Sequence, residues 1–221
     1  MFGRIVPRYD LLNRLMSLGM DAGWRRAAAT AARPAGALAL DVGAGTGDLT
    51  LELLRQGARR VVAADLTPAM LAAGREKARR RRAGGAVWLA ADALRLPFRD
   101  ETFDAVTNAF VLRNLERLQA GLDEMTRVLK PGGRLVCLDM TRPRPGPFAT
   151  IYRLYFHHLL PPLAGLVSGD REAYRYLPRS LDRHPDAATL ASMLERAGLI
   201  DVRVQRLGVG TVALHTGAKP A

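Results

Sequence analysis

The chain has 221 residues, of which 48% are hydrophobic and 24% are charged, a globular balance that suits a single α/β domain with additions. Its one cysteine, Cys137, excludes an intramolecular disulfide and favours a reducing compartment. No secretion signal and no run of about 18 apolar residues is present, so we expect a cytoplasmic protein. The formal net charge of +12 favours attraction to polyanions, either nucleic acid or an anionic surface such as the inner face of the membrane.

Residues 1–35 are predicted to form amphipathic helices, interrupted near Gly19 and Gly23, that would act as a lid. Pro34 ends this region because it cannot continue a helix. The α/β core is expected in residues 36–141, where buried strands and helices begin to alternate.

The core opens with a buried strand at residues 38–42 that runs into a short glycine loop and then a helix. The loop contains three alternate glycines, Gly43, Gly45 and Gly47. Such glycines permit a tight turn and leave no side chains in a ligand's way. The flanking acids Asp41 and Asp48 would repel a pyrophosphate, so the loop favours a cationic, phosphate-free cofactor such as S-adenosylmethionine. An ordinary strand-turn-helix corner is the alternative, and Asp48 has the alternative of serving its own helix N-terminus.

Two further acids lie at the carboxyl ends of predicted strands. Asp65 ends the second strand, near the spacing of about 20 residues from the glycine loop at which an acid bonds a ribose in nucleotide folds. Asp92 ends the third strand, at residues 87–91. Open α/β sheets bind ligands at this edge, so both are candidate site residues. Asp104 begins the fourth strand, residues 103–109, at the opposite edge and is expected to be structural.

The later elements complete the sheet. A helix is predicted over residues 115–129, ended by Lys130-Pro131-Gly132-Gly133 before a fifth strand at residues 135–139. Residues 142–185 interrupt the alternation with an aromatic and aliphatic stretch. We interpret this stretch as an insertion that binds substrate, and a pair of core helices is the alternative. Residues 186–221 are predicted to supply a closing helix and an antiparallel pair of strands.

The chain resembles the class I S-adenosylmethionine methyltransferases, and within them the ubiquinone/menaquinone biosynthesis C-methyltransferases that act on polyprenyl quinols. The general resemblance lies in Asp41 to Gly47, Asp65, Asp92-Ala93 and the Lys130-Pro131-Gly132-Gly133 turn. The family-specific resemblance lies in Arg8-Tyr9-Asp10, Leu112-Arg113-Asn114, Ser168-Gly169-Asp170, Tyr174 to Pro178, His184-Pro185-Asp186 and Ala213-Leu214-His215. The resemblance implies a Rossmann-like α/β fold, a mostly parallel seven-stranded sheet with helices on both faces and helical additions near the N-terminus and late in the chain.

The resemblance also implies roles for individual residues. The expected cofactor contacts are Asp41, Gly43, Gly45, Thr46 and Gly47 around the methionine part, Asp65 at the ribose, Asp92 and Ala93 at the adenine, and Asn108 and Tyr9 elsewhere. Arg113 and Asn114 are the expected catalytic pair. The guanidinium of an arginine keeps its proton and cannot readily act as a base, so Arg113 is expected to stabilise the quinolate or orient a water. Asn114 is expected to hydrogen-bond a quinol oxygen. An ion-bridged helix entry is the structural alternative for this pair.

The implied reaction is transfer of a methyl group from S-adenosylmethionine to a ring carbon of demethylmenaquinol or a related benzoquinol, with no metal. The expected partners are this polyprenyl quinol and an anionic membrane surface; a homodimer is left open, and no nucleic acid is expected. A small-molecule or RNA methyltransferase and a cofactor-binding regulator are the rival interpretations. The sequence departs from the family at Asn108-Ala109-Phe110-Val111, at Asp139-Met140-Thr141 and in a short segment before Tyr9.

Overall fold

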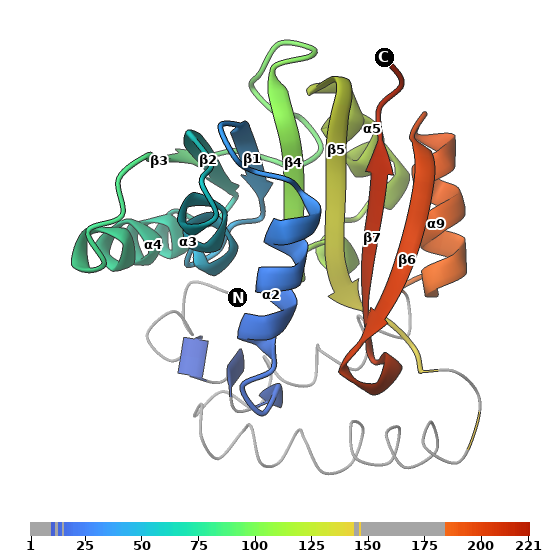
Figure 1. Ribbon diagram of the computed structural model, residues 1–221, viewed down its shortest axis with the longest axis horizontal. Helices are drawn as coiled ribbons and strands as arrows, with labels where there is room; N and C mark the ends of the chain where they lie inside the picture. Colours follow the sequence, from blue (N-terminus) through green and yellow to red (C-terminus); the bar gives the residue numbers. More distant parts are fainter. Residues whose placement is uncertain (1–9, 12, 15, 144–145, 147–183) are drawn as a thin grey trace.

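The computed structural model describes residues 10–11, 13–14, 16–143, 146 and 184–221. Its centre is a seven-stranded sheet in the order β3-β2-β1-β4-β5-β7-β6 (Figure 1). The strands are β1 (Leu38–Val42), β2 (Arg60–Asp65), β3 (Ala86–Ala90), β4 (Phe103–Ala109), β5 (Leu129–Met140), β6 (Ile200–Leu207) and β7 (Val212–Ala218). Strands β1 to β5 pair in parallel, and β7 is antiparallel to both β5 and β6. The predicted α/β fold, with its antiparallel closing pair, is confirmed.

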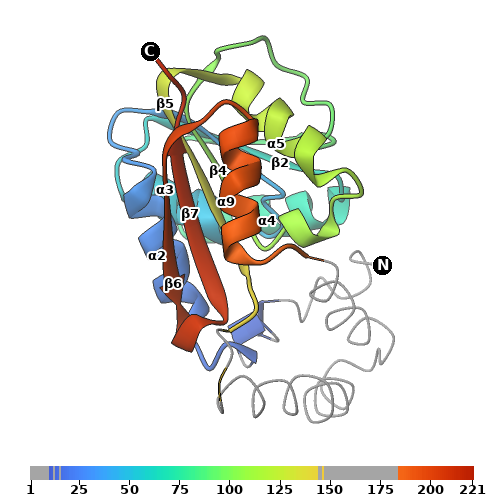
Figure 2. The same cartoon turned by 90° about the vertical axis from the view of Figure 1, so that its right-hand side faces the viewer.

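Helices cover both faces of the sheet. They are α2 (Asp21–Ala31), α3 (Asp48–Arg55), α4 (Pro68–Arg80), α5 (Leu118–Arg127) and α9 (Ala187–Arg196), with short 3-10 helices η2 (Leu112–Asn114) and η4 (Gly208–Gly210). Figure 2 shows α2 and α3 on one side of the sheet and α5 and α9 on the other. Strand β1 is buried on both sides, because Ala39 packs with α2 and α3 while Leu40 and Val42 pack with α5 and α9. This explains its continuous apolar sequence.

Local signals in the sequence set several boundaries. Pro68 occupies the first turn of α4, where its fixed φ suits a helix and its missing N–H costs no hydrogen bond. Asp186 caps α9, since its side chain accepts a hydrogen bond from the Thr189 N–H at 2.8 Å. Asp104 has the expected structural role: it accepts from the Leu38 N–H at 2.8 Å and pairs with Lys130 at 2.7 Å.

Two predicted boundaries are wrong. Helix α2 runs through Gly23 without interruption. Helix α5 ends at Arg127, and β5 begins at Leu129, so the Lys130-Pro131-Gly132-Gly133 turn lies inside the strand. The residue that follows β7 pairs with this turn, because the Gly132 N–H donates to the Lys219 carbonyl at 2.9 Å.

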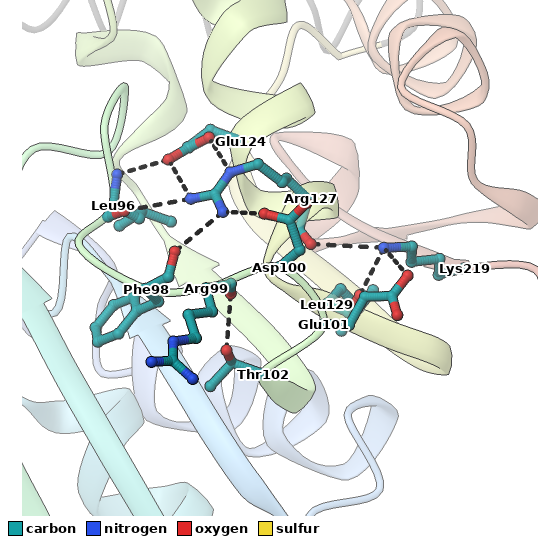
Figure 3. Close-up of polar contacts among 10 residues, drawn as sticks. All are labelled: Leu96, Phe98, Arg99, Asp100, Glu101, Thr102, Glu124, Arg127, Leu129 and Lys219. Carbon is teal, nitrogen blue, oxygen red and sulfur yellow. Dashed lines mark hydrogen bonds and ion pairs between the residues drawn. The ribbon is translucent and has the colours of Figure 1, made fainter.

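Arg127 fixes the segment that joins β3 to β4 (Figure 3). Its guanidinium donates to the Phe98 carbonyl at 3.0 Å and to the Leu96 carbonyl at 3.3 Å. It also pairs with Glu124 at 2.8 Å and with Asp100. The segment that follows Asp92 is therefore fastened to α5 rather than free to move over the edge of the sheet.

The indole of Trp88, on β3, fills the space between the glycine loop and α4. An added Cβ at Gly47 would lie 2.3 Å from Trp88 Cη2, and one at Gly74 in the middle of α4 would lie 2.3 Å from Trp88 Cζ3. Gly47 also has a φ of +81°. Both glycines are therefore required by the close approach of the ring, and Gly47 is required by the turn as well.

A carboxyl group is buried in the central strand at Asp41. The residue is 1% exposed and accepts hydrogen bonds from the hydroxyls of Thr50 at 2.6 Å and Thr107 at 3.4 Å. Burial raises the pKa of Asp41 to about 7, against the hydrogen bond from Thr50 and the positive charge of Arg25, which lower it. This carboxyl therefore titrates near neutrality.

Gly74 on α4 and Gly23 on α2 give a matched test of the Trp88 contact. We expect Gly74→Ala to lower the free energy of unfolding by roughly 1–3 kcal/mol, because the methyl group collides with the indole. Gly23→Ala on α2, where no atom lies within 4 Å of the added Cβ, is expected to raise it by roughly 0.5–1 kcal/mol. Urea unfolding of the two variants measures both changes, and equal effects would contradict the contact.

Asp41 predicts a pH dependence of stability. Its pKa is higher in the folded chain than in the unfolded one, so the folded state binds the extra proton and stability falls as pH rises from about 4 to about 7. The rise of the Asp41 pKa to about 7 corresponds to at most roughly 4 kcal/mol of stability. Urea unfolding without cofactor at pH 5 and pH 8 should show Asp41→Asn gaining stability relative to wild type at the higher pH. Parallel pH profiles for the two proteins would contradict the assignment.

Candidate active site

The carboxyl ends of the parallel strands surround a cavity of about 220 Å³. It opens where the strand order reverses beside β1, the position at which open α/β sheets bind ligands. The lining residues come from the glycine loop, the ends of β2, β3 and β4, and the start of α4: Gly43, Gly45, Asp65, Leu66, Thr67, Met70, Ala91, Asp92, Ala93, Ala109, Phe110, Val111, Asn114 and Leu115. Six residues expected at the site from the sequence are thus brought together here: Gly43, Gly45, Asp65, Asp92, Ala93 and Asn114.

The glycine loop is shaped by left-handed backbone conformations. Gly43 has a φ of +66°, and an added Cβ would lie 2.4 Å from the side chain of Val111. Gly45 has a φ of +55°, yet nothing lies within 4 Å of the position its Cβ would take. Gly45 therefore faces the open cavity, and a side chain there would fill space that a ligand needs. This observation fits the cofactor cradle predicted from the sequence.

Asp65 holds the loop and lines the cavity at the same time. Its Oδ2 accepts the Gly45 N–H and its Oδ1 accepts the Thr67 N–H, each at 2.8 Å. Each carboxylate oxygen has a second acceptor site, so the group is still able to accept two hydroxyl donors. The geometry suits a ribose diol, the contact expected for this residue.

Asp92 and Ala93 form the opposite wall of the cavity with Met70. The Asp92 Oδ1 accepts the Leu94 N–H at 2.9 Å, which closes a tight turn after β3. The small Ala93 and the apolar Met70 both line the cavity. A small, apolar lining of this kind suits a planar aromatic ring.

A second, smaller cavity of about 30 Å³ adjoins the first and shares Gly43, Gly45 and Ala109 with it. Its other lining residues are Arg25, Asp41, Ala44, Thr46, Asp48 and Leu49. Both acids that flank the glycine loop therefore contribute to this wall. A ligand that spans the two cavities would place one end among these charges and the other near Asp65 and Asp92.

Lys77 and Asp10 close one side of the glycine loop. The Lys77 ammonium pairs with Asp48 at 2.8 Å and with Asp10 at 2.6 Å, and donates to the Thr46 hydroxyl at 3.1 Å. The Thr46 hydroxyl donates to Asp10 at 2.6 Å. Burial raises the pKa of Asp48, but the charge of Lys77 and its hydrogen bond outweigh this and leave the pKa lowered. Asp48 thus stays anionic, and it both begins α3 and lines the smaller cavity.

Arg113 and Asn114 lie just beyond β4, in η2. Asn114 lines the larger cavity. The Arg113 guanidinium instead pairs with Asp139 at 2.6 Å, with their side chains 10% and 2% exposed, and lies 5.7 Å from the centre of the Phe110 ring. Its Nε is buried and has no hydrogen-bond partner within the part of the chain that the structure describes. Arg113 therefore belongs to the wall behind the cavity and has a donor to spare.

Three expected cofactor contacts are not placed at either cavity. Gly47 lines neither of them, and the position of its absent Cβ lies against the Trp88 ring. Asn108 is fully buried, and its amide nitrogen lies 3.0 Å from Cys137 Sγ and 3.5 Å from Met125 Sδ, so its side chain faces the α5 side of the sheet. The structure thus places the Asn108 side chain away from both cavities. Tyr9 and most of the 142–185 insertion lie outside the described residues.

Several residues at the site were not predicted from the sequence. Arg25, Lys77 and Asp10 reach the glycine loop from helical segments that are remote in the chain. Phe110 adopts a φ of +61°, an uncommon conformation for an aromatic residue that marks the end of β4. The sequence gives no sign of this turn, because position 110 holds a phenylalanine and not a glycine or an asparagine, the residues that favour a positive φ.

Comparison with known proteins gives the family. A family model described as the ubiE/COQ5 methyltransferase family matches residues 1–219. A demethylmenaquinone methyltransferase of Thermus thermophilus is 49% identical over 223 residues, which cover 100% of both chains. One of Mycobacterium marinum is 47% identical over 221 residues, covering 100% of this chain and 92% of the relative.

Solved structures support the fold. A methyltransferase of Thermotoga maritima, described as a possible histamine N-methyltransferase, aligns with a TM-score of 0.68 at 17% identity and covers 99% of this chain and 98% of that one. A SAM-dependent methyltransferase of Aquifex aeolicus aligns with a TM-score of 0.61 at 22% identity, covering 86% and 85% of the two chains. With the full-length match to the family model and relatives close to half identical, the chain belongs to the ubiE/COQ5 methyltransferase family.

Proposed function

We propose that this chain transfers a methyl group from S-adenosylmethionine to a ring carbon of a polyprenyl quinol, of the demethylmenaquinol type. The observation that carries the proposal is the full-length similarity, at 49% identity, to a protein named demethylmenaquinone methyltransferase. The acid-lined double cavity supports the cofactor, because it offers carboxylates and few basic groups to a ligand that carries positive charge and no phosphate. A related benzoquinol of the ubiquinone pathway is the alternative substrate.

In this proposal each part of the cofactor has its own residues. Asp65 binds the ribose hydroxyls, Asp92 and Ala93 border the adenine, and Gly43 and Gly45 admit the methionine part. When bound, the cofactor supplies an electrophilic methyl group on its sulfonium. The chain's contribution is to hold the acceptor carbon in line with that group and to exclude water, and such positioning can supply much of the rate.

Asn114 and Arg113 act on the quinol. Asn114 lines the cavity and hydrogen-bonds a quinol oxygen. Loss of the hydroxyl proton to solvent water would push electron density into the ring and make its carbon nucleophilic. After the methyl group is transferred, that carbon would release its own hydrogen to solvent as a proton and the ring would become aromatic again. Arg113 stabilises the resulting negative oxygen, because its guanidinium stays protonated and Asp139 holds it in place at 2.6 Å.

We further propose peripheral contact with an anionic membrane surface, where a prenylated substrate resides. The support is the net charge of +12. Among the described residues no helix is long and apolar enough to cross a bilayer. The predicted tail-binding role of residues 142–185 and a homodimer stay predictions.

The reaction is tested with labelled S-adenosylmethionine and three acceptors: demethylmenaquinol, a benzoquinol of the ubiquinone pathway and RNA. We expect methylated quinol with demethylmenaquinol preferred. Methylated RNA alone would overturn the proposal, and it is the outcome that the net positive charge would favour if nucleic acid were the partner.

Membrane contact is tested by supplying the quinol in anionic or in neutral vesicles. If the contact is electrostatic, the quinol is methylated faster in anionic vesicles at low salt, and the two rates become equal at high salt.

Arg113→Ala tests the catalytic assignment. We expect kcat to fall by roughly 10²–10³-fold, the usual cost of removing one group that stabilises a developing oxyanion, while the Kd for S-adenosylmethionine changes little. Arg113→Lys should recover part of kcat, since it restores the charge without the planar guanidinium.

The matched control is Arg117→Ala, an exposed arginine four residues further on. It is expected to turn over like wild type. If Arg113→Ala bound the cofactor and turned over at a near-normal rate, the assignment of Arg113 to stabilising the quinolate would be wrong.

A further inference from the structure

The small cavity beside the glycine loop is lined by one cation and two acids that lie close together. Arg25 comes from α2, outside the strand-loop-helix unit that carries Asp41 and Asp48. The residue is 9% exposed although it is an arginine. Its positive charge also lowers the pKa of both acids, Asp41 and Asp48, which burial raises most strongly. A buried arginine is normally paired, and Arg25 pairs with Asp21, yet its guanidinium also faces a cavity.

A network on α2 fixes the direction of the Arg25 side chain. One nitrogen, Nη1, donates to Asp21 Oδ2, one turn earlier in the helix. Asp21 is itself held by the Ser17 hydroxyl, which donates to Oδ1 at 3.0 Å. The guanidinium carbon lies 5.4 Å from the centre of the Phe110 ring, at the end of β4. Arg25 is thus braced against movement before any ligand arrives.

The guanidinium keeps unused donors. Within the described part of the chain, Nη1 is the one Arg25 nitrogen with a hydrogen-bond partner. Lys77, the other cation beside the loop, is different: its ammonium already contacts Thr46, Asp48 and Asp10. Lys77 has three donors for three partners, so among the described residues beside the loop Arg25 is the cation that is left for a ligand.

We propose that Arg25 binds the carboxylate of the methionine part of the cofactor, and that Asp41 and Asp48 face its ammonium. The inference rests on the proposed cofactor. The methionine end is a zwitterion, and a cavity with one braced guanidinium and two carboxylates matches both of its charges. The larger cavity continues from here through Gly43 and Gly45 toward Asp65, in the order that the cofactor's own parts require. Arg25 therefore makes α2 part of the cofactor site.

The test compares two ligands that differ by one group, S-adenosylmethionine and its decarboxylated form, by isothermal titration calorimetry. Wild type is expected to bind S-adenosylmethionine about 10- to 100-fold more tightly, the range for one charge-assisted contact. Arg25→Gln should weaken S-adenosylmethionine by a similar factor and leave the decarboxylated form within about threefold of wild type. Arg25→Lys should retain part of the preference. Arg26→Gln, the exposed neighbour on α2 whose side chain is 67% exposed, is the matched control and should bind like wild type.

Each outcome decides the matter. If Arg25→Gln weakened both ligands equally, Arg25 would only support the structure of α2 and the inference would fail. If wild type bound the two ligands equally, no carboxylate contact would exist, and this result needs no variant to fold. If wild type bound neither ligand, the proposed cofactor would be wrong, and this inference would fall with it.

Discussion

The hydrogen bond from the Gly45 N–H to Asp65, at 2.8 Å, joins the glycine loop to the end of the neighbouring strand, and the site depends on it. A second contact, from the Ala44 N–H to the Ala64 carbonyl at 3.0 Å, lies beside it. Together they hold a loop whose glycines adopt left-handed φ angles. Glycine itself has little preference between left-handed and right-handed backbone conformations, so these contacts are needed to fix the loop. Because Asp65 is also a cavity wall, the group that shapes the loop is the group that would meet the ligand. The geometry of the loop and of this cavity wall are therefore coupled through one carboxylate.

Much of this arrangement follows from the sequence because parallel strands share an edge. Asp65 and Asp92 are far apart in the chain, yet each follows a buried strand, so both arrive at the carboxyl edge beside the glycine loop. Asp104 begins a strand and arrives at the opposite edge, where it pairs with Lys130 at 2.7 Å. Strand direction thus separates Asp65 and Asp92, which line the cavity, from Asp104, which does not. The same rule explains why Ala93 and Asn114 could be placed correctly without any side-chain information.

Asn108 shows a signal that was present in the sequence but not used. Side chains alternate along a strand, so Asn108 must face the same side as Val106. Val106 packs in the cluster of α5, and Asn108 accordingly lies against Met125. Ala109, one residue later, faces the other way and lines both cavities. Arg25 and Lys77 are a different case, because helix packing brings them to the loop and no spacing in the chain encodes that packing.

Charge has two separate roles in this molecule. The chain carries +12 overall, yet the charged residues that line the cavities are mainly carboxylates, including the buried Asp41 and the partly exposed Asp65. Arginines such as Arg79 and Arg80 are 77% and 75% exposed and share Glu76 at 2.8 Å, so salt screens them and each pair contributes little. Charges inside the small cavity are screened far less, because water and ions have little access to them. Added salt should therefore weaken the proposed contact with an anionic surface while the proposed cofactor binding persists, so salt distinguishes the two roles of charge.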